Sequence, residues 1–184
     1  EETGEAWRTV ARVADGSVVG LVSLYRSSPP NPGLYEIGQL MVRHDYRLTD
    51  VALELQMFCL EYVPKERSLE QIWGEAVCNH LYTQQFAARE GFVETALEVG
   101  LMPGESFSKA FKTVSTDKER VSTLAGFRSF KARAQTLYLP KVYEAALRFI
   151  YEATDYGHEF LLSEAPLPAE VKTQATMQGF GSAG

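Results

Sequence analysis

The stretch from Gln39 to Val63, QLMVRHDYRLTDVALELQMFCLEYV, constrains the fold more than any other part of the chain. Its pattern predicts a strand, a short polar turn and a long helix with two apolar faces. The first face is formed by residues at i, i+3, i+4 and i+7 spacing: Leu48, Val51, Ala52, Leu55, Phe58, Cys59 and Tyr62. The second is formed by Leu53, Met57 and Leu60. We therefore expect little of this helix to be exposed, and we expect free N–H groups at its start to favour an anion.

Composition narrows the function classes. A chain of 184 residues with 45% hydrophobic and 23% charged residues is typical of one soluble domain with its own core, with or without an appendage. The net charge of −6 argues against a nucleic-acid or anionic-membrane surface. No apolar run reaches the roughly 18 residues of a membrane span, and no leader-like segment opens the chain, which begins without Met. These features predict a cytoplasmic location.

Cysteine and histidine usage gives no metal motif. We interpret Cys59 and Cys78 as small core residues of a protein in a reducing compartment. The three histidines are scattered and no CxxC is present, which argues against a zinc site.

Turn and proline signals place further elements along the chain. The expected strands are 7–14, 17–25, 34–42, 72–78, 92–101 and 120–130. Pro64 is expected to stop the long helix, and a second helix over 80–90 is closed by Gly91. The crossover makes strands 34–42 and 72–78 parallel neighbours, and the polar loop 105–119 allows the last two strands to pair antiparallel.

The C-terminal part predicts a helical extension. Residues 136–139 are extended, Pro140 suits a first helical position, and a helix is expected over 141–156. Its apolar stripe is Val142, Ala146, Phe149, Ile150 and Ala153. We expect this stripe to pack against the main domain or against another copy of it. Residues 165–184 have linker composition. The expected division is a domain over 1–135 and a C-terminal helix and tail over 136–184.

Two motifs carry a resemblance to a known family. The segments VRHDYRLTDVA, from Val42 to Ala52, and FAAREGF, from Phe86 to Phe92, resemble the signatures of the GNAT superfamily of acyl-CoA-dependent N-acetyltransferases. The resemblance implies an α/β fold: a mixed, mostly antiparallel sheet with a central βαβ unit. In this chain the C-terminal helical extension is added, and the family's first strand and first two helices are missing. The sheet is expected to be splayed between strands 34–42 and 72–78.

The resemblance also implies a cofactor, acetyl-CoA or CoA, and a set of residues to hold it. Its pantetheine would lie along the strand edge, and its pyrophosphate would lie on the turn and the helix start, with an arginine beside it. The implied residues are Leu40, Met41, Val42, Arg47, Leu48, Thr49, Asp50, Val51, Ala52 and Asn79. Two residues depart from the family pattern. Asp50 replaces a glycine, and Ala87 replaces the tyrosine that protonates the leaving thiolate in many members.

Two functions follow from the resemblance. The first is transfer of an acetyl group from acetyl-CoA to a small-molecule or protein amine, with Glu36 as general base and Glu75 as a weaker candidate. The second is a catalytically inactive, ligand-sensing or protein-interaction module of a longer regulatory protein, favoured by Asp50 and Ala87. A homodimer or a neighbouring domain would be its partner.

Overall fold

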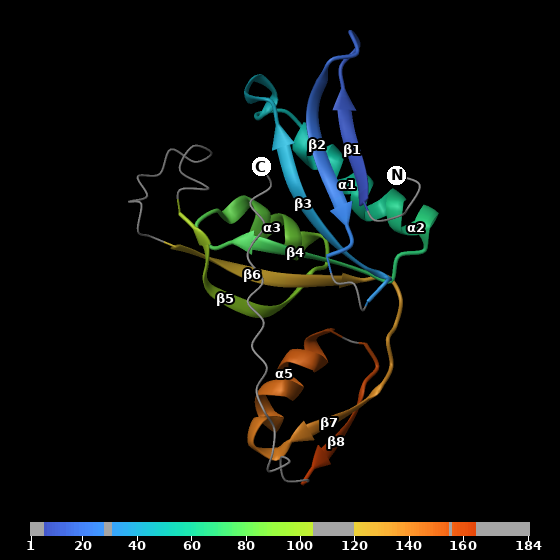
Figure 1. The fold of residues 1–184 in the computed structure, drawn as a ribbon, viewed down its shortest axis with the longest axis vertical. Coiled ribbons are helices and arrows are strands. Elements are labelled where there is room, and N and C mark those ends of the chain that lie inside the picture. Colours follow the sequence, from blue (N-terminus) through green and yellow to red (C-terminus); the bar gives the residue numbers. More distant parts are fainter. Residues whose placement is uncertain (1–5, 28–30, 105–119, 155, 165–184) are drawn as a thin grey trace.

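A six-stranded mixed sheet organises the computed structural model, which describes residues 6–27, 31–104, 120–154 and 156–164 (Figure 1). Its strands are β1 (Ala6–Arg12), β2 (Val18–Tyr25), β3 (Leu34–Val42), β4 (Gln71–Val77), β5 (Val93–Pro103) and β6 (Arg120–Ser129). The strand order is β1-β2-β3-β4-β6-β5. Only β3 and β4 pair in parallel, and every other neighbouring pair is antiparallel. The predicted α/β fold class, a mostly antiparallel sheet around a central βαβ unit, is confirmed.

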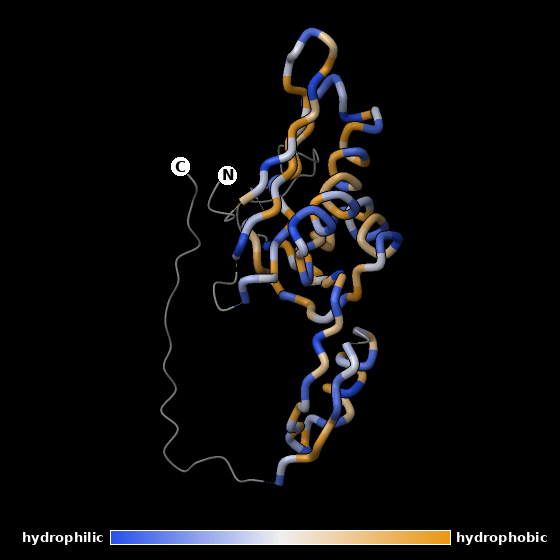
Figure 2. The backbone as a smooth tube through the Cα atoms, turned by 90° about the vertical axis from the view of Figure 1, so that its right-hand side faces the viewer, coloured by the Kyte–Doolittle hydropathy of each residue, from blue (hydrophilic) through white to orange (hydrophobic). Residues whose placement is uncertain are grey.

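Helices cover one side of this sheet and build the core. They are α1 (Val51–Met57), a π-helical turn (Phe58–Tyr62), α2 (Val63–Arg67) and α3 (Leu81–Arg89), with a 3-10 turn (His44–Tyr46) before α1. Figure 2 shows the sheet with helices beside it on one side. The core cluster joins both layers and contains Val22, Leu24, Tyr35, Leu55, Cys59, Leu60, Val63, Leu69, Ile72 and Phe86.

The helix after β3 differs from its prediction in two ways. Pro64 does not stop it, because the chain widens into the π-helical turn and continues to Arg67. Proline lacks an N–H and clashes with the carbonyl four residues earlier, and a π turn relieves both problems. The second error concerns burial: Leu48 is fully exposed, and Phe58 and Tyr62 stack on each other at the surface. Of the predicted faces only Leu55, Cys59 and Leu60 are buried, and Val63, which belonged to neither face, joins them in the core.

Truncating a leucine should therefore have opposite consequences at two positions of this segment. We expect Leu60→Ala, at a side chain only 1% exposed, to lower the free energy of unfolding by about 2–5 kcal/mol. We expect Leu48→Ala, the same truncation at an exposed site, to change it by less than about 0.5 kcal/mol. Urea unfolding of both variants measures the difference. Equal losses would mean that Leu48 is buried as the sequence pattern suggested.

Local signals predicted two turns correctly. Asp15 and Gly16 form the β1–β2 hairpin turn, where the Ser17 N–H donates to Asp15 Oδ1 at 2.8 Å and Gly16 has a φ of 86°. Gly91 follows α3 with a φ of 75°. The Gly91 and Phe92 N–H groups donate to the carbonyls of Ala88 and Ala87, which is the Schellman pattern.

The prediction that both cysteines are core residues is correct for only one of them. Cys59 is buried, but Cys78 is exposed, because it lies in the turn that follows β4. The loop predicted over 105–119 lies outside the described residues. None of the described helices is long and apolar enough to cross a membrane.

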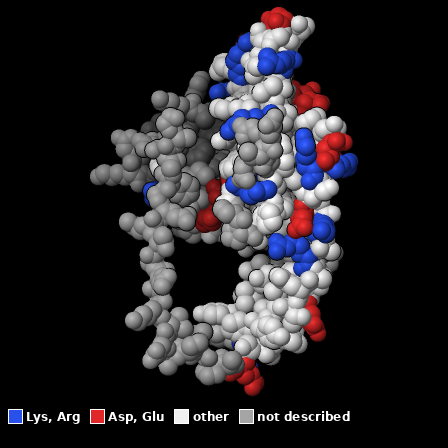
Figure 3. Space-filling model, turned by 45° about the vertical axis from the view of Figure 1, so that its right-hand side comes forward, with Lys and Arg blue, Asp and Glu red and all other residues white. Residues whose placement is uncertain are grey.

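The C-terminal part contains the predicted helix together with a small second sheet, and the predicted tail over 165–184 lies outside the described residues. It contains β7 (Thr136–Pro140), a 3-10 turn (Lys141–Tyr143), α5 (Glu144–Thr154) and β8 (Glu159–Ser163). Strands β7 and β8 pair in parallel, and β8 was not predicted. On the face seen in Figure 3, this lower part of the molecule carries few charged side chains.

Most of the predicted apolar stripe of the C-terminal helix is exposed, and of its residues only Ile150 turns toward the main sheet. Val142 and Phe149 are 81% and 80% exposed. The α5 residues that turn inward are Leu147, Ile150, Tyr151 and Thr154, which line a cavity of about 420 Å³ shared with the ends of the main sheet. The side of α5 that faces the main sheet is therefore rotated about the helix axis from the side that the sequence predicted.

Candidate functional site

Strands β3 and β4 separate soon after they meet. They pair through three positions only: Leu34 with Gln71, Tyr35 with Ile72, and Glu36 with Trp73. Beyond Glu36, β3 continues to Val42 beside β2, and β4 continues beside β6. The predicted divergence of two neighbouring parallel strands at their C-terminal ends is confirmed. The backbone groups of β3 beyond Glu36 that face β4 consequently have no strand partner.

A bulge in β3 accompanies this separation. Gln39 has a φ of 56°, which is unusual for a residue other than glycine. The β2–β3 register shifts at the same place, between Leu21 and Ser23. Because a bulge bends its strand and increases its twist, it directs the end of β3 away from β4.

A cavity of about 270 Å³ occupies the gap between the separated strands. Its walls come from β3 (including Leu40), β4 (including Gly74 and Glu75) and α3 (including Phe86 and Ala87). Gly74 keeps the gap open, because a Cβ there would lie 3.0 Å from Cγ2 of Ile37. The lining is mostly apolar, which suits an extended ligand with few polar groups.

Gln56 adds a polar group to these apolar walls. This α1 residue lines the cavity and is 5% exposed, and its Nε2 has no hydrogen-bond partner among the described residues. An unpaired buried donor costs about 1–3 kcal/mol. It therefore marks a place where a ligand with a carbonyl acceptor would gain a hydrogen bond.

Carboxylates gather on the other face of the sheet. Glu36 and Glu75 extend from the face opposite the helices, and the Tyr25 hydroxyl donates to Glu36 Oε1. Burial, followed by the charges of Glu98 and Glu36, raises the pKa of Glu75 to about 7. Burial and the hydrogen bond to Glu36 raise the pKa of Tyr25, so its hydroxyl remains a donor. Glu75 lies at the cavity wall, whereas Glu36 does not line it.

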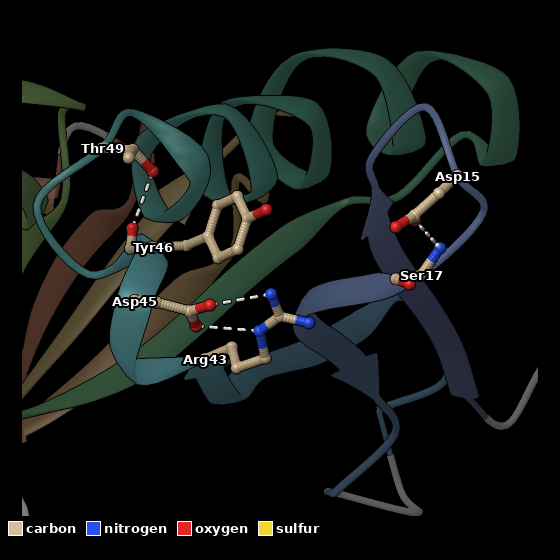
Figure 4. A network of polar contacts seen from close by, with 6 residues as sticks. All are labelled: Asp15, Ser17, Arg43, Asp45, Tyr46 and Thr49. Atoms are coloured by element: carbon tan, nitrogen blue, oxygen red, sulfur yellow. Dashed lines mark hydrogen bonds and ion pairs between the residues drawn. The ribbon is translucent and has the colours of Figure 1, made fainter.

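Charged and polar side chains of the loop before α1 bond to other groups of the same loop (Figure 4). The guanidinium of Arg43 donates two hydrogen bonds of 2.8 Å to Asp45, and this pairing lowers the pKa of the Asp45 carboxyl. Arg47 donates to the carbonyl of Val42 at 3.3 Å. Thr49 bonds the carbonyl of Tyr46 at 2.6 Å and accepts from the Val51 N–H at 3.4 Å. Asp50 makes no side-chain cap bond, so its carboxylate does not occupy the N–H groups at the start of α1, of which Val51 and Glu54 donate to Thr49 and to the Asp50 carbonyl.

The predicted site residues lie in two groups. Leu40 is the only one of the predicted cofactor-binding residues that lines the described cavity. The loop group, residues 47–52, lies at the start of α1, while Met41 and Asn79 are exposed. Residues missed by sequence reasoning are Tyr25, Gln56 and Glu98. A glutamine among apolar helix positions and a glutamate within an alternating strand were the available signals.

Solved structures of low sequence identity share this architecture. No family model and no curated protein matches the sequence. The spermidine/spermine N-acetyltransferase SpeG of Vibrio cholerae is 16% identical, with a TM-score of 0.54 over 68% of this chain and 65% of that one. The ribosomal-protein-S5-alanine acetyltransferase of Vibrio fischeri is 12% identical, with a TM-score of 0.55 over 70% of this chain and 63% of that one.

A third similar structure is a putative phosphinothricin N-acetyltransferase, which is 15% identical with a TM-score of 0.54 over 67% of this chain and 68% of that one. This chain therefore spans about two thirds of the length of these neighbours. The fold is that of the GNAT acetyltransferases.

Proposed function

We propose that this chain transfers an acetyl group from acetyl-CoA to an amine. The observation that carries the proposal is the gap between β3 and β4, which holds an apolar cavity with Glu75 at its wall. A long thioester ligand can enter such a gap from the helix side while an amine approaches from the carboxylate side.

The residues around the gap fit CoA. The unpaired β3 edge at Leu40, Met41 and Val42 offers backbone groups to pantetheine amides, and Gln56 offers an unpaired donor beside them. The helix start from Leu48 to Ala52, where the Thr49 and Val51 N–H groups are already engaged within the loop, would hold the pyrophosphate with Arg47 beside it. Bound acetyl-CoA supplies an activated thioester. The protein supplies orientation and removal of the amine proton.

We place Glu75 first as the general base, with Glu36 as the second candidate. A base works best when its pKa lies near the operating pH, and Glu75 has that property while Glu36 is engaged by Tyr25. In the proposed step the amine nitrogen bonds to the carbonyl carbon, the carbon–sulfur bond breaks with its electron pair leaving on sulfur as the CoA thiolate, and the amine proton passes to the Glu75 carboxylate. Carboxylates on this face favour an acceptor that approaches as a cation, as the spermidine named for SpeG would.

The second candidate function is an inactive module that binds CoA or a partner without turnover. It is favoured by Ala87, which lines the cavity where an acid for the leaving thiolate is expected, and by the Asp50 carboxylate at the helix start. As a module it would act with a neighbouring domain or a second copy, and we propose a cytoplasmic location for either function.

Thiol release distinguishes these functions. The chain is incubated with acetyl-CoA and separate amines: spermidine, a primary monoamine, and a peptide with a free N-terminal alanine. We expect thiol release with at least one amine, at a rate that increases with pH through about 7, as the Glu75 carboxyl ionises. Binding of CoA by calorimetry without release with any amine would establish the module instead. If the chain neither binds CoA nor releases thiol, acetyl-CoA is refuted as the ligand.

A further inference from the structure

Three carboxylates on one face of the sheet have no cationic partner among the residues that the structure describes. Glu36, Glu75 and Glu98 come from β3, β4 and β5, and within the described ranges none of them forms an ion pair with a lysine, arginine or histidine. All three are partly buried. Partly buried carboxylates are normally paired or protonated, so their mutual repulsion has to be relieved by protons or by a ligand.

Thr123 fixes the position of Glu98 within this group. Its hydroxyl donates to Glu98 Oε2 at 2.9 Å, and Thr123 itself is completely buried. Thr123 lies on β6, opposite Val77 of β4 on one side and opposite Glu98 of β5 on the other. The Glu98 carboxylate is thereby held over the face of β6 that Glu75 also faces, since Glu75 pairs with Ala125, two positions from Thr123 on the same strand.

The other groups facing Glu75 are few. From β3 the neighbour is Glu36, whose carboxylate is engaged by Tyr25 of β2. From β6 this face presents Thr123, Ala125 and Phe127, none of which is charged. After burial, the charge of Glu98 is the largest contributor to the raised pKa of Glu75. Glu94 lines the cavity from the same strand as Glu98 without contributing to this effect.

We propose that Glu98 is a positioning residue for Glu75, and that a proton taken up by Glu75 is shared with Glu98 through a hydrogen bond. This inference rests on the proposed function, in which Glu75 is the base. With both carboxyl groups ionised, Glu75 is a stronger base than an isolated glutamate. When the amine N–H bond breaks, the new O–H bond on Glu75 is directed toward the Glu98 carboxylate. Thr123 keeps that acceptor in place during turnover.

Carboxyl titration by NMR tests the pair in the free chain without any substrate. The full chain carries ¹³C-labelled glutamate, and the Glu75 signal is assigned from its loss in Glu75→Gln. We expect Glu98→Gln, which removes the charge but keeps an acceptor for Thr123, to lower the Glu75 midpoint by about half to one pH unit. Glu98→Asp, which keeps the charge, should restore most of the shift.

Glu94→Gln is the matched control, because it removes the same charge from the same strand at the cavity wall. It should leave the Glu75 midpoint within about 0.2 units. The inference is overturned if Glu98→Gln leaves the midpoint unchanged, or if Glu94→Gln moves it equally. This readout is independent of acetyl transfer, so a chain that proved inactive would refute the proposed reaction while the titration still decided the pair.

Discussion

Glu75→Gln is expected to reduce the rate of acetyl transfer by about 100- to 10,000-fold, the usual contribution of a general base. The amide cannot accept the amine proton, while its size and position are preserved. The KM for acetyl-CoA should change little, because Glu75 lies on the amine side of the gap. Initial rates from pH 6 to 9 measure the effect, and the rise in rate through pH 7 should disappear with the carboxyl group. Glu36→Gln is measured in parallel. If it causes the larger loss of rate, Glu36 and not Glu75 is the general base.

The same variant gives a stability signal that needs no substrate. A carboxyl pKa raised on folding means that the folded state binds more protons than the unfolded state, so stability falls as pH rises from about 4.5 to about 7. Replacing Glu75 with glutamine removes that loss. Because the side chain is partly exposed, we expect a gain of only about 1 kcal/mol at pH 8 and none at pH 4. A destabilised Glu75→Gln at pH 8 would mean that the carboxylate is well solvated or paired.

Asp50→Gly is expected to tighten CoA binding by about tenfold. Two arrangements could have removed the Asp50 charge from a bound pyrophosphate, namely a cap bond to α1 or a pair with Arg47. Neither occurs, since Asp50 makes no cap bond and Arg47 bonds Val42. Like charges about 4 Å apart repel by roughly 1 kcal/mol in water and roughly 4 kcal/mol at an effective dielectric of 20, and the exposed position favours the lower part of that range.

Calorimetry with acetyl-CoA on the parent chain and both Asp50 variants measures this effect. Asp50→Asn separates the charge from backbone freedom, because it removes the carboxylate without adding a glycine. Glu152→Gln on α5 changes the net charge equally at a distant site and should leave the affinity unchanged. Tight binding by the parent chain would contradict the charge argument, and no binding by any of the proteins would leave only the protein-interaction function.

Features that depend on neighbouring positions in sequence were predictable. The β3–helix–β4 crossover required two parallel neighbours, and the turns at Gly16 and Gly91 followed from glycine chemistry. The Pro64 prediction failed, because whether a helix breaks or widens at a proline depends on how the next turn packs against the sheet. Strand β8 was missed since its short, partly exposed sequence has no strong alternation.

Within the site, sequence reasoning identified the strand edge and the loop but not the residues that meet across strands. Glu98 is far from Glu75 in sequence, and only the insertion of β6 between β4 and β5 brings them to the same face. Gln56 is unremarkable until its amide is found without a partner beside a cavity. The preference for Glu75 over Glu36 likewise depends on which side chain reaches the gap and on the Tyr25 bond, and neither is encoded in spacing.

The three residue pairs that join β3 to β4 have a mechanical consequence. They join two three-stranded halves, β1-β2-β3 and β4-β6-β5, each of which is held together by longer antiparallel pairings that are interrupted only at bulges. Because the two halves are joined at one end and separated at the other, the last joined pair, Glu36 and Trp73, is placed as a hinge between them. Small rotations of one half against the other would then change the width of the open end without breaking strand pairing.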